Sequence, residues 1–451
     1  MRTTVLRATL GAAVVFGLFA TSAVPAGAAV DTSRKPQVLV GVGSDATYEV
    51  MNDLDQVYNQ APGCAIIPAV GTAFTNYEQQ CIDNGQLTYA SDYADLIETE
   101  NLYHDMVVEA YPTGSGNGAS TLVQHLLGNP AIDGAFSRSS SKRTITATGY
   151  TVYGSAFARD GLGVWTGKNN KAVAVNSAGV AQPAFQFGDL NDVWRGDGSS
   201  QCLVNWSKTA NDSIAATKVA ISSFTATGNG GTIKVYATQQ GSGTGKDFAS
   251  KISGLSLSDA SSLKNCIPSN FKDGDFSNGE RVIFENNARP VCSQTVGAGT
   301  ANDASRAIYP YSYARFVQNN AKAGDCPGVL GSVDGIKPSL KTIGDLNPLT
   351  GYAVLGRYVY NYFPVPDGVG GFNINDASTW GALSSSQEAV LSYLHPTLGF
   401  LCSTSHADDP FTGVNIRTQL ESSMKKDGFA PIPSGPVGGS TFSGGSYCRD
   451  V

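Results

Sequence analysis

Three loops rich in glycine, serine and threonine are the parts of this sequence whose residue types could bind a ligand. They occupy residues 43–47, 113–118 and 241–244, and helical periodicity follows each of them. A glycine-rich loop that opens a helix leaves backbone N–H groups unpaired, and the helix dipole adds about half a positive charge there. Hydroxyl groups inside the loops add hydrogen-bond donors. The pattern predicts a site for a small anion, although each loop alone also fits an ordinary turn with a helix cap.

Each of these loops is preceded by a short apolar run that predicts a β-strand. After the first loop, Val50, Leu54 and Tyr58 fall on one helical face, and after the second loop Leu122 begins a similar stripe. Glycine and proline at 128–130 are expected to end the second helix. Strands that alternate with helices in this way predict an α/β fold with largely parallel sheets. The predicted strands are 38–42, 106–108 and 233–237.

Other chemistries have weaker support. Residues 243–246 (Gly-Thr-Gly-Lys) resemble a nucleotide phosphate loop, but Gln240 and Asp247 stand where that motif needs a glycine and a hydroxyl residue. His406 and the acids at 408–409 could bind a metal, whereas an exposed polar loop explains the same residues without one. None of the four histidines lies in a hydrolase or zinc-protease motif. We therefore predict no catalytic residue, no metal and no cofactor.

Composition and the N-terminal segment indicate export. The chain has 451 residues, with 30 Lys and Arg against 37 Asp and Glu, so a broad basic surface for nucleic acid is not expected. Residues 1–28 have the pattern of a signal peptide, with Arg2 and Arg7, an apolar run over 10–23 and a small-residue cleavage site at 26–28. No cysteine closely follows that site to carry a lipid. We expect a secreted protein, extracellular or in the cell envelope, soluble and not inserted in a membrane.

The eight cysteines are expected to form disulfides, because exported proteins fold in an oxidising compartment. No Cys-x-x-Cys motif occurs, so a zinc ribbon has no support. The sequence alone does not fix the pairing. Pairing between neighbours is our preferred hypothesis, with Cys64–Cys81 and Cys402–Cys448 as the first choices.

The three loops together resemble those of the substrate-binding proteins of phosphate ABC transporters, which have the type II periplasmic binding-protein fold. The segment 41–48 is similar to that family's Gly-Ala-Gly-Ala-Thr-Phe loop, 114–118 to its Gly-Ser-Ser-Gly-Gly loop, and 240–244 to its Asp-Gly-Ser-Gly-Thr loop. The resemblance implies a non-enzymatic protein that binds phosphate and partners an ABC permease. The ligand contacts that it implies are Thr47, the Tyr48 backbone, Ser115, Ser242, Gly243 and Thr244.

Two positions depart from the family pattern at the groups that select the ligand. Arg138 stands where the family has an aspartate that accepts the proton of the bound phosphate, and Thr238 stands where it has an arginine. We therefore add Arg138 as a ligand contact, because a guanidinium can hold an oxyanion through two donors. Asp45 is the candidate proton acceptor, with Asp133 as an alternative. Without such an acceptor, the site has no means of favouring hydrogen phosphate over sulfate.

The resemblance implies two lobes, each a mixed sheet flanked by helices, with the ligand cleft between them. We expect residues 36–149 and 306–451 in the first lobe and 150–305 in the second. The predicted function is a secreted, monomeric solute-binding protein for phosphate or a phosphate-like oxyanion. Two alternatives stay open: a secreted hydrolase such as a phosphoesterase that uses the same cleft, and a binding scaffold that has lost its ligand.

Overall fold

The computed structural model describes most of the chain outside the N-terminal region and several loops. The predicted signal peptide and the pair Cys64 and Cys81 lie outside the described residues. The described residues are 38–60, 106–109, 114–129, 132, 134–167, 174–175, 181–182, 184–185, 187–196, 202, 234–267, 281–293, 307–320, 328–345, 347, 349–406, 408 and 413–450.

The largest sheet is mixed, and its central strands are long and antiparallel. Its main path runs β2-β1-β3-β13-β4-β11-β8. The strands of this path are β1 Val38–Gly43, β2 Met106–Glu109, β3 Phe136–Ser139, β4 Tyr150–Gly167, β8 Lys234–Val235, β11 Ala307–Ser312 and β13 Gly356–Pro366. Strands β12 Gly328–Val333, β14 Ala430–Pro431 and β17 Arg449–Asp450 also pair with β4. Smaller pairs are formed by β9 Ala237–Thr238 with β10 Val282–Ile283, β5 Ala174–Val175 with β6 Ala181–Gln182, and β15 Gly435–Pro436 with β16 Gly445–Ser446.

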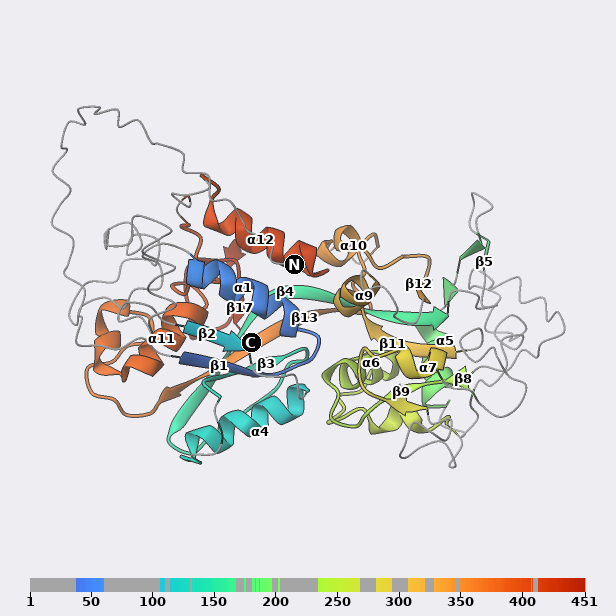
Figure 1. The fold of residues 1–451 in the computed structure, drawn as a ribbon, viewed down its shortest axis with the longest axis horizontal. Coiled ribbons are helices and arrows are strands. Elements are labelled where there is room, and N and C mark those ends of the chain that lie inside the picture. The colour runs from blue at the N-terminus through green and yellow to red at the C-terminus, as the bar shows by residue number, and fades with distance from the viewer. Residues whose placement is uncertain are drawn as a thin grey trace, which may run out of the picture.

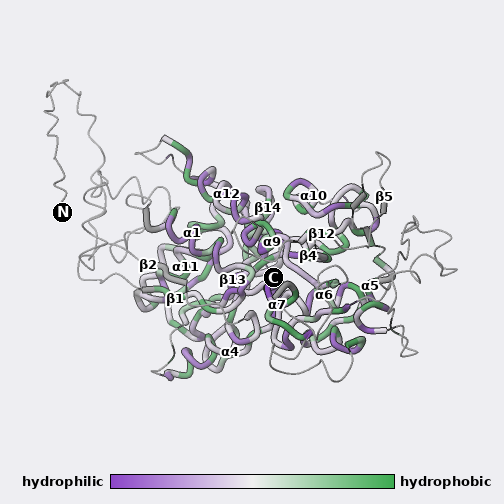
Figure 2. The backbone as a smooth tube through the Cα atoms, turned by 45° about the vertical axis from the view of Figure 1, so that its right-hand side comes forward, coloured by the Kyte–Doolittle hydropathy of each residue, from purple (hydrophilic) through white to green (hydrophobic). Residues whose placement is uncertain are grey.

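Helices cover this sheet on both sides of the molecule (Figure 1). Figure 2 shows hydrophilic and hydrophobic residues mixed along α1 and α12, as expected of helices that pack one face against a core. The helices are α1 Tyr48–Gln60, α4 Ser115–Leu126, α5 Phe187–Trp194, α6 Gly243–Ser253, α7 Arg289–Ser293, α9 Tyr313–Asn320, α10 Leu340–Gly344, α11 Ser385–Leu394 and α12 Ile416–Lys426, with 3₁₀ turns at η3 Ser261–Lys264 and η6 Ala377–Ala382.

The two largest hydrophobic cores both include residues of the long strand β4, and the first also includes residues of β13. These strands run between two groups of helices in Figure 1. The first core contains the buried faces of α1, α11 and α12, including Leu54 of α1, together with Trp380 of η6. The second contains Trp194 and Phe248, whose rings meet edge to face at 4.9 Å. Ile308, which the sequence analysis assigned to the first lobe, packs in this second core. The lobe boundaries given above stay a prediction.

All three predicted strand-loop-helix modules form, but the sheet is not largely parallel. Strand β1 pairs in parallel with β2 and β3, whereas β13 and β11 pair antiparallel with β4. The predicted third strand forms as two short pieces, β8 and β9, on either side of Tyr236. The antiparallel pairing was not predicted, because the periodicity of a strand does not give the direction in which it pairs with its neighbours.

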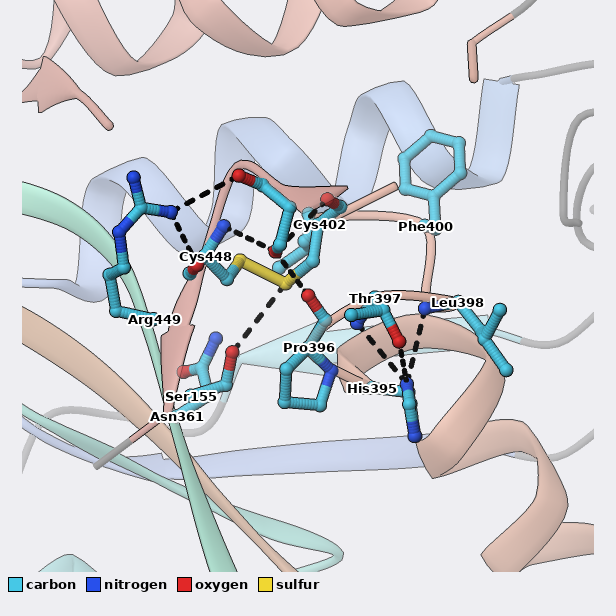
Figure 3. Close-up of a disulfide and its surroundings, with 12 residues drawn as sticks. Ser155, Asn361, His395, Pro396, Thr397, Leu398, Phe400, Cys402, Cys448 and Arg449 are labelled. Carbon is cyan, nitrogen blue, oxygen red and sulfur yellow. Dashed lines mark hydrogen bonds between the residues drawn. A yellow bond between two sulfur atoms is a disulfide. The ribbon is translucent and has the colours of Figure 1, made fainter. Parts of the chain in front are cut away.

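Two disulfides are present among the described residues. The bridge Cys402–Cys448 confirms one of the predicted pairs, and Cys202–Cys266 agrees with pairing between neighbours. Figure 3 shows the first beside His395, whose Nδ1 accepts the N–H of Leu398 at 3.1 Å. Such a bridge stabilises the fold mainly by restricting the unfolded chain. In the described part of the chain, no helix is long and apolar enough to span a bilayer.

Candidate functional site

The first two glycine-rich loops contact each other directly. The N–H of Gly114 donates to the carbonyl of Gly43 at 3.0 Å, which fixes the start of α4 against the end of β1. Gly43 has φ of 132°, and a Cβ there would overlap the carbonyl oxygen of Arg138 on the neighbouring strand β3. Only glycine allows this approach without strain. The first loop therefore needs Gly43 in order to reach both β3 and α4.

The second and third loops also meet. A Cβ added to Gly243 would overlap the hydroxyl oxygens of Ser115 and Ser140, so the start of α6 lies against these two serines. Ser115 Oγ lies 3.2 Å from Ser140 Oγ and accepts the Ser140 N–H at 3.1 Å. All three residues are buried. The N-terminus of α6 is thus packed against a pair of hydroxyl groups from α4 and from the end of β3.

Asn286 connects the first loop to the third. Its Nδ2 donates to Asp45 Oδ2 at 3.3 Å and lies 3.5 Å from Thr244 Oγ1. Asn286 has φ of 59°, a left-handed conformation that asparagine adopts more readily than most residues. All three loops singled out in the sequence therefore converge on one place.

Arg138 is fully buried rather than a surface charge. Its exposed fraction is 0%, and its Nη1 donates to the carbonyl of Ser44 at 2.7 Å. Its guanidinium carbon lies 5.4 Å from the centre of the Tyr48 ring, within range of a cation–π contact. A buried guanidinium beside the first loop supplies positive charge where water is excluded. Its predicted contact with a ligand stays a prediction.

Two predicted ligand contacts on the first loop already have internal hydrogen-bond partners. The Tyr48 N–H donates to the carbonyl of Asp45 at 3.2 Å, and Thr47 Oγ1 donates to the carbonyl of Ser44 at 3.3 Å. By contrast, the buried hydroxyls of Ser44 and Ser141 have no hydrogen-bond partner among the described residues. Unpartnered buried hydroxyls are uncommon in folded proteins, so these two are additional candidates for ligand donors.

Glu285, which was not predicted from the sequence, accepts hydrogen bonds at the start of α6. Ser242 caps the helix by accepting the Gly245 N–H at 2.9 Å, and its hydroxyl donates to Glu285 Oε2. The Thr244 N–H donates to the same oxygen at 3.1 Å. Burial raises the pKa of Glu285, and the nearby Asp45 carboxylate raises it further. Glu285 follows the two-residue strand β10, and no local motif marks it.

A buried ion pair also reaches the third loop. Arg357 on β13 donates through Nη2 to Asp160 on β4 at 2.7 Å and to Thr244 Oγ1 at 3.1 Å. Asp160 also accepts the hydroxyl of Ser312 at 2.9 Å. Arg138 was the only guanidinium predicted for this site. Arg357 provides a second one, and it lies within a long apolar strand where a single arginine has no recognisable signature.

Other charged groups surround the loops. Asp45, the predicted proton acceptor, pairs with Arg315 Nε at 3.4 Å, and its role as acceptor stays a prediction. Asp133 lies outside the described residues. Arg143, just after β3, donates through Nε to Ser139 Oγ at 3.3 Å, and burial lowers the pKa of its guanidinium. Acidic and basic side chains therefore both lie around the three loops.

The histidines serve the fold at the positions that the structure describes. His406 lies 2.7 Å from the carbonyl of Phe400 through its Nε2, and burial lowers the pKa of His406 to about 4. Burial likewise lowers the pKa of His395 to about 3, so its ring stays neutral and can accept N–H groups. Among the described residues, no group of three or more potential metal ligands comes together. Asp409 lies outside them.

Comparison with known proteins gives similarity to solved structures only. No known protein family and no curated protein matches this chain significantly. An ABC-type phosphate transport receptor from Vibrio cholerae is 14% identical, with 72% of this chain and 86% of that chain covered and a TM-score of 0.37. A possible phosphate-binding protein from Planctomyces limnophilus is 15% identical, with 73% and 82% covered and a TM-score of 0.32. PstS from Borrelia burgdorferi is 14% identical, with 87% and 98% covered and a TM-score of 0.35.

Proposed function

We propose that this protein is a secreted solute-binding protein that holds a small oxyanion, phosphate or phosphate-like, where its three glycine-rich loops meet. The observation that carries the proposal is the convergence of these loops around buried hydroxyls and a buried guanidinium. Gly243 lies against Ser115 and Ser140, and Asn286 links Asp45 to the third loop. Such a cluster offers many donors to a small anion without a basic surface.

The proposed contacts divide between charge and hydrogen bonding. Arg138 and Arg357 would supply positive charge in a place where water does not screen it. The N-terminus of α4 begins at Gly114, which has no side chain to cap it, so its first N–H groups are suitable donors. Hydroxyl donors would come from Ser44, Ser115 and Ser141. Thr47, Tyr48, Ser242, Gly243 and Thr244 remain the contacts that the family resemblance implies.

Titration calorimetry on extensively dialysed protein tests this function directly. We expect phosphate or arsenate to bind with a dissociation constant of about 1 µM or below, which is a binding free energy on the order of 8 kcal/mol. Arg138→Ala should weaken binding by about 1.5–3 kcal/mol, because a charged donor is lost. Arg417→Ala is the matched control, since Arg417 is also buried but lies against Glu421 and the Tyr447 ring.

The outcomes separate the candidate roles. Affinity lost in Arg138→Ala and kept in Arg417→Ala supports the proposal, provided that circular dichroism shows both variants folded. Turnover of a chromogenic phosphate ester by the wild type would favour a phosphoesterase. If phosphate, arsenate and sulfate all give no heat with the wild type and with a Glu285→Gln variant, the chain is a scaffold that does not bind this ligand.

A further inference from the structure

Glu285 occupies hydrogen-bond donors that the proposed function assigns to an anion. Its Oε2 accepts the Ser242 hydroxyl and the Thr244 N–H, the second at 3.1 Å. Helix α6 has eleven residues, so its N-terminus has a full dipole. A carboxylate oxygen and a phosphate oxygen present the same acceptor chemistry to such an end. The protein thus places an anion of its own where an external anion would bind.

Backbone hydrogen bonds and strand pairing fix the position of Glu285. Its N–H donates to Gln239 Oε1 at 2.7 Å, and β10 just before it pairs with β9 in front of α6. The Gln239 N–H donates in turn to the carbonyl of Ile283 at 3.1 Å. The loop after β10 is therefore tied to the loop that opens α6, and the side chain at 285 is directed at that helix end.

Burial leaves part of this carboxylate unsatisfied. Glu285 is 4% exposed, and its Oε1 has no hydrogen-bond partner among the described residues. An unsatisfied buried acceptor is costly. The charged groups that face it come from three other elements: Asp45 in the loop before α1, Arg357 on β13 and Arg143 after β3. The pKa of Tyr309 on β11 is raised by burial and, to a smaller extent, by the Glu285 charge.

We infer that Glu285 sets the affinity of the site for oxyanions by acting as a built-in competitor for the donors of α6. This inference rests on the proposed function. An incoming dianion must either displace the Glu285 carboxylate or meet it in its neutral, protonated form, because two anions cannot share the same two donors at close range. Glu285 is a specificity-determining residue in this scheme, since it sets how much negative charge the site accepts.

The competition couples anion binding to proton uptake. Burial and the Asp45 carboxylate raise the pKa of Glu285, so its neutral form is reached at a higher pH than for an exposed glutamate. Lowering the pH protonates Glu285 and removes the competing charge. Affinity for a dianion should therefore rise as pH falls and decline as pH rises through the pKa of Glu285. Sulfate is the suitable probe, because it stays a dianion throughout this range.

Sulfate titrations of wild type and Glu285→Gln at about pH 5 and about pH 8 test the inference. Glutamine keeps the shape and an acceptor oxygen but removes the charge. We expect the variant to bind sulfate at least about tenfold more tightly at the higher pH and to lose most of the pH dependence. Glu388→Gln is the matched control, because Glu388 is a buried glutamate in the first turn of α11. It should leave both properties unchanged.

Each result has a defined meaning. Sulfate binding by Glu285→Gln alone, with a silent wild type, supports the inference, since the site is then closed by its own carboxylate. Equal affinities and equal pH profiles in the two proteins would overturn the inference and leave the proposed function standing. Weaker sulfate binding by the variant would also overturn it. Silence of both proteins toward sulfate at both pH values would overturn the inference, whereas the proposed function fails only if phosphate and arsenate also give no heat with both proteins.

Discussion

The N-termini of α4 and α6 begin from similar glycine- and serine-rich loops, yet different partners satisfy them. Helix α4 starts at Gly114, which has no capping side chain, and no acid lies in its first turn. Helix α6 starts at Ser242, which caps it, and Glu285, 43 residues further along the chain, closes it. The loop sequence therefore determines where a helix end begins and which N–H groups it offers. Whether that end is open is decided by residues distant in sequence.

The two helix ends also differ in how they are anchored. Helix α4 is held by backbone contact, through the Gly114 N–H on the Gly43 carbonyl. Helix α6 is held by side chains, since Arg357 joins Thr244 to the buried Asp160. An anchor of backbone hydrogen bonds tolerates substitution of nearby side chains, whereas an anchor made of one ion pair depends on two residues. The substitutions Asp160→Asn and Gly243→Ala test this difference between the two helices.

Asp160→Asn should have the largest effect on stability. It removes the countercharge at 2.7 Å from the buried Arg357 guanidinium and leaves, among the described residues, only Asp247, at 3.9 Å, and the loss of one partner of a buried pair costs about 3–5 kcal/mol. Urea unfolding followed by circular dichroism measures this free energy. Glu421→Gln is the control, because its pairs with Arg417 and Lys425 are more exposed and should be worth about 1 kcal/mol or less. Equal costs in the two variants would contradict the side-chain anchor of α6.

Gly243→Ala should have the next largest effect, and it acts on the contact between the two helix ends. The added Cβ overlaps the hydroxyl oxygens of Ser115 and Ser140, so α6 must move away from α4. Overpacking of this kind costs about 1–3 kcal/mol, and anion affinity should fall because the donors separate. Gly254→Ala is a control for the added methyl group, since a Cβ there meets no atom within 4 Å, although its φ of 67° adds some strain of its own. Unchanged binding in Gly243→Ala would show that the loops do not act together.

The sequence was sufficient to predict the loops and the helices that follow them, because glycine, serine and apolar periodicity are local signals. Strands β1 and β2 and helices α1, α4 and α6 all form where expected. Glu285 and Arg357 were not predicted. Each depends on pairing between distant segments, β10 with β9 and β13 with β4, and a single charged residue in a short or apolar strand has no periodicity to mark it.

Ser242→Ala and Ser115→Ala should have the smallest effects and give the finest comparison of the two ends. Ser242 accepts the Gly245 N–H as a helix cap, so its loss should cost about 1 kcal/mol of unfolding free energy. Ser115 caps no helix, and in the described part of the chain its hydroxyl hydrogen-bonds only to Ser140, so its loss should cost less. Ser384→Ala, at the capped start of α11, calibrates an ordinary cap away from the site. If Ser242→Ala lowers the free energy of unfolding no more than Ser115→Ala does, then Glu285 rather than Ser242 stabilises the start of α6. In that case, adding Glu285→Gln to Ser242→Ala should lower the free energy of unfolding by about the 1 kcal/mol expected of a helix cap.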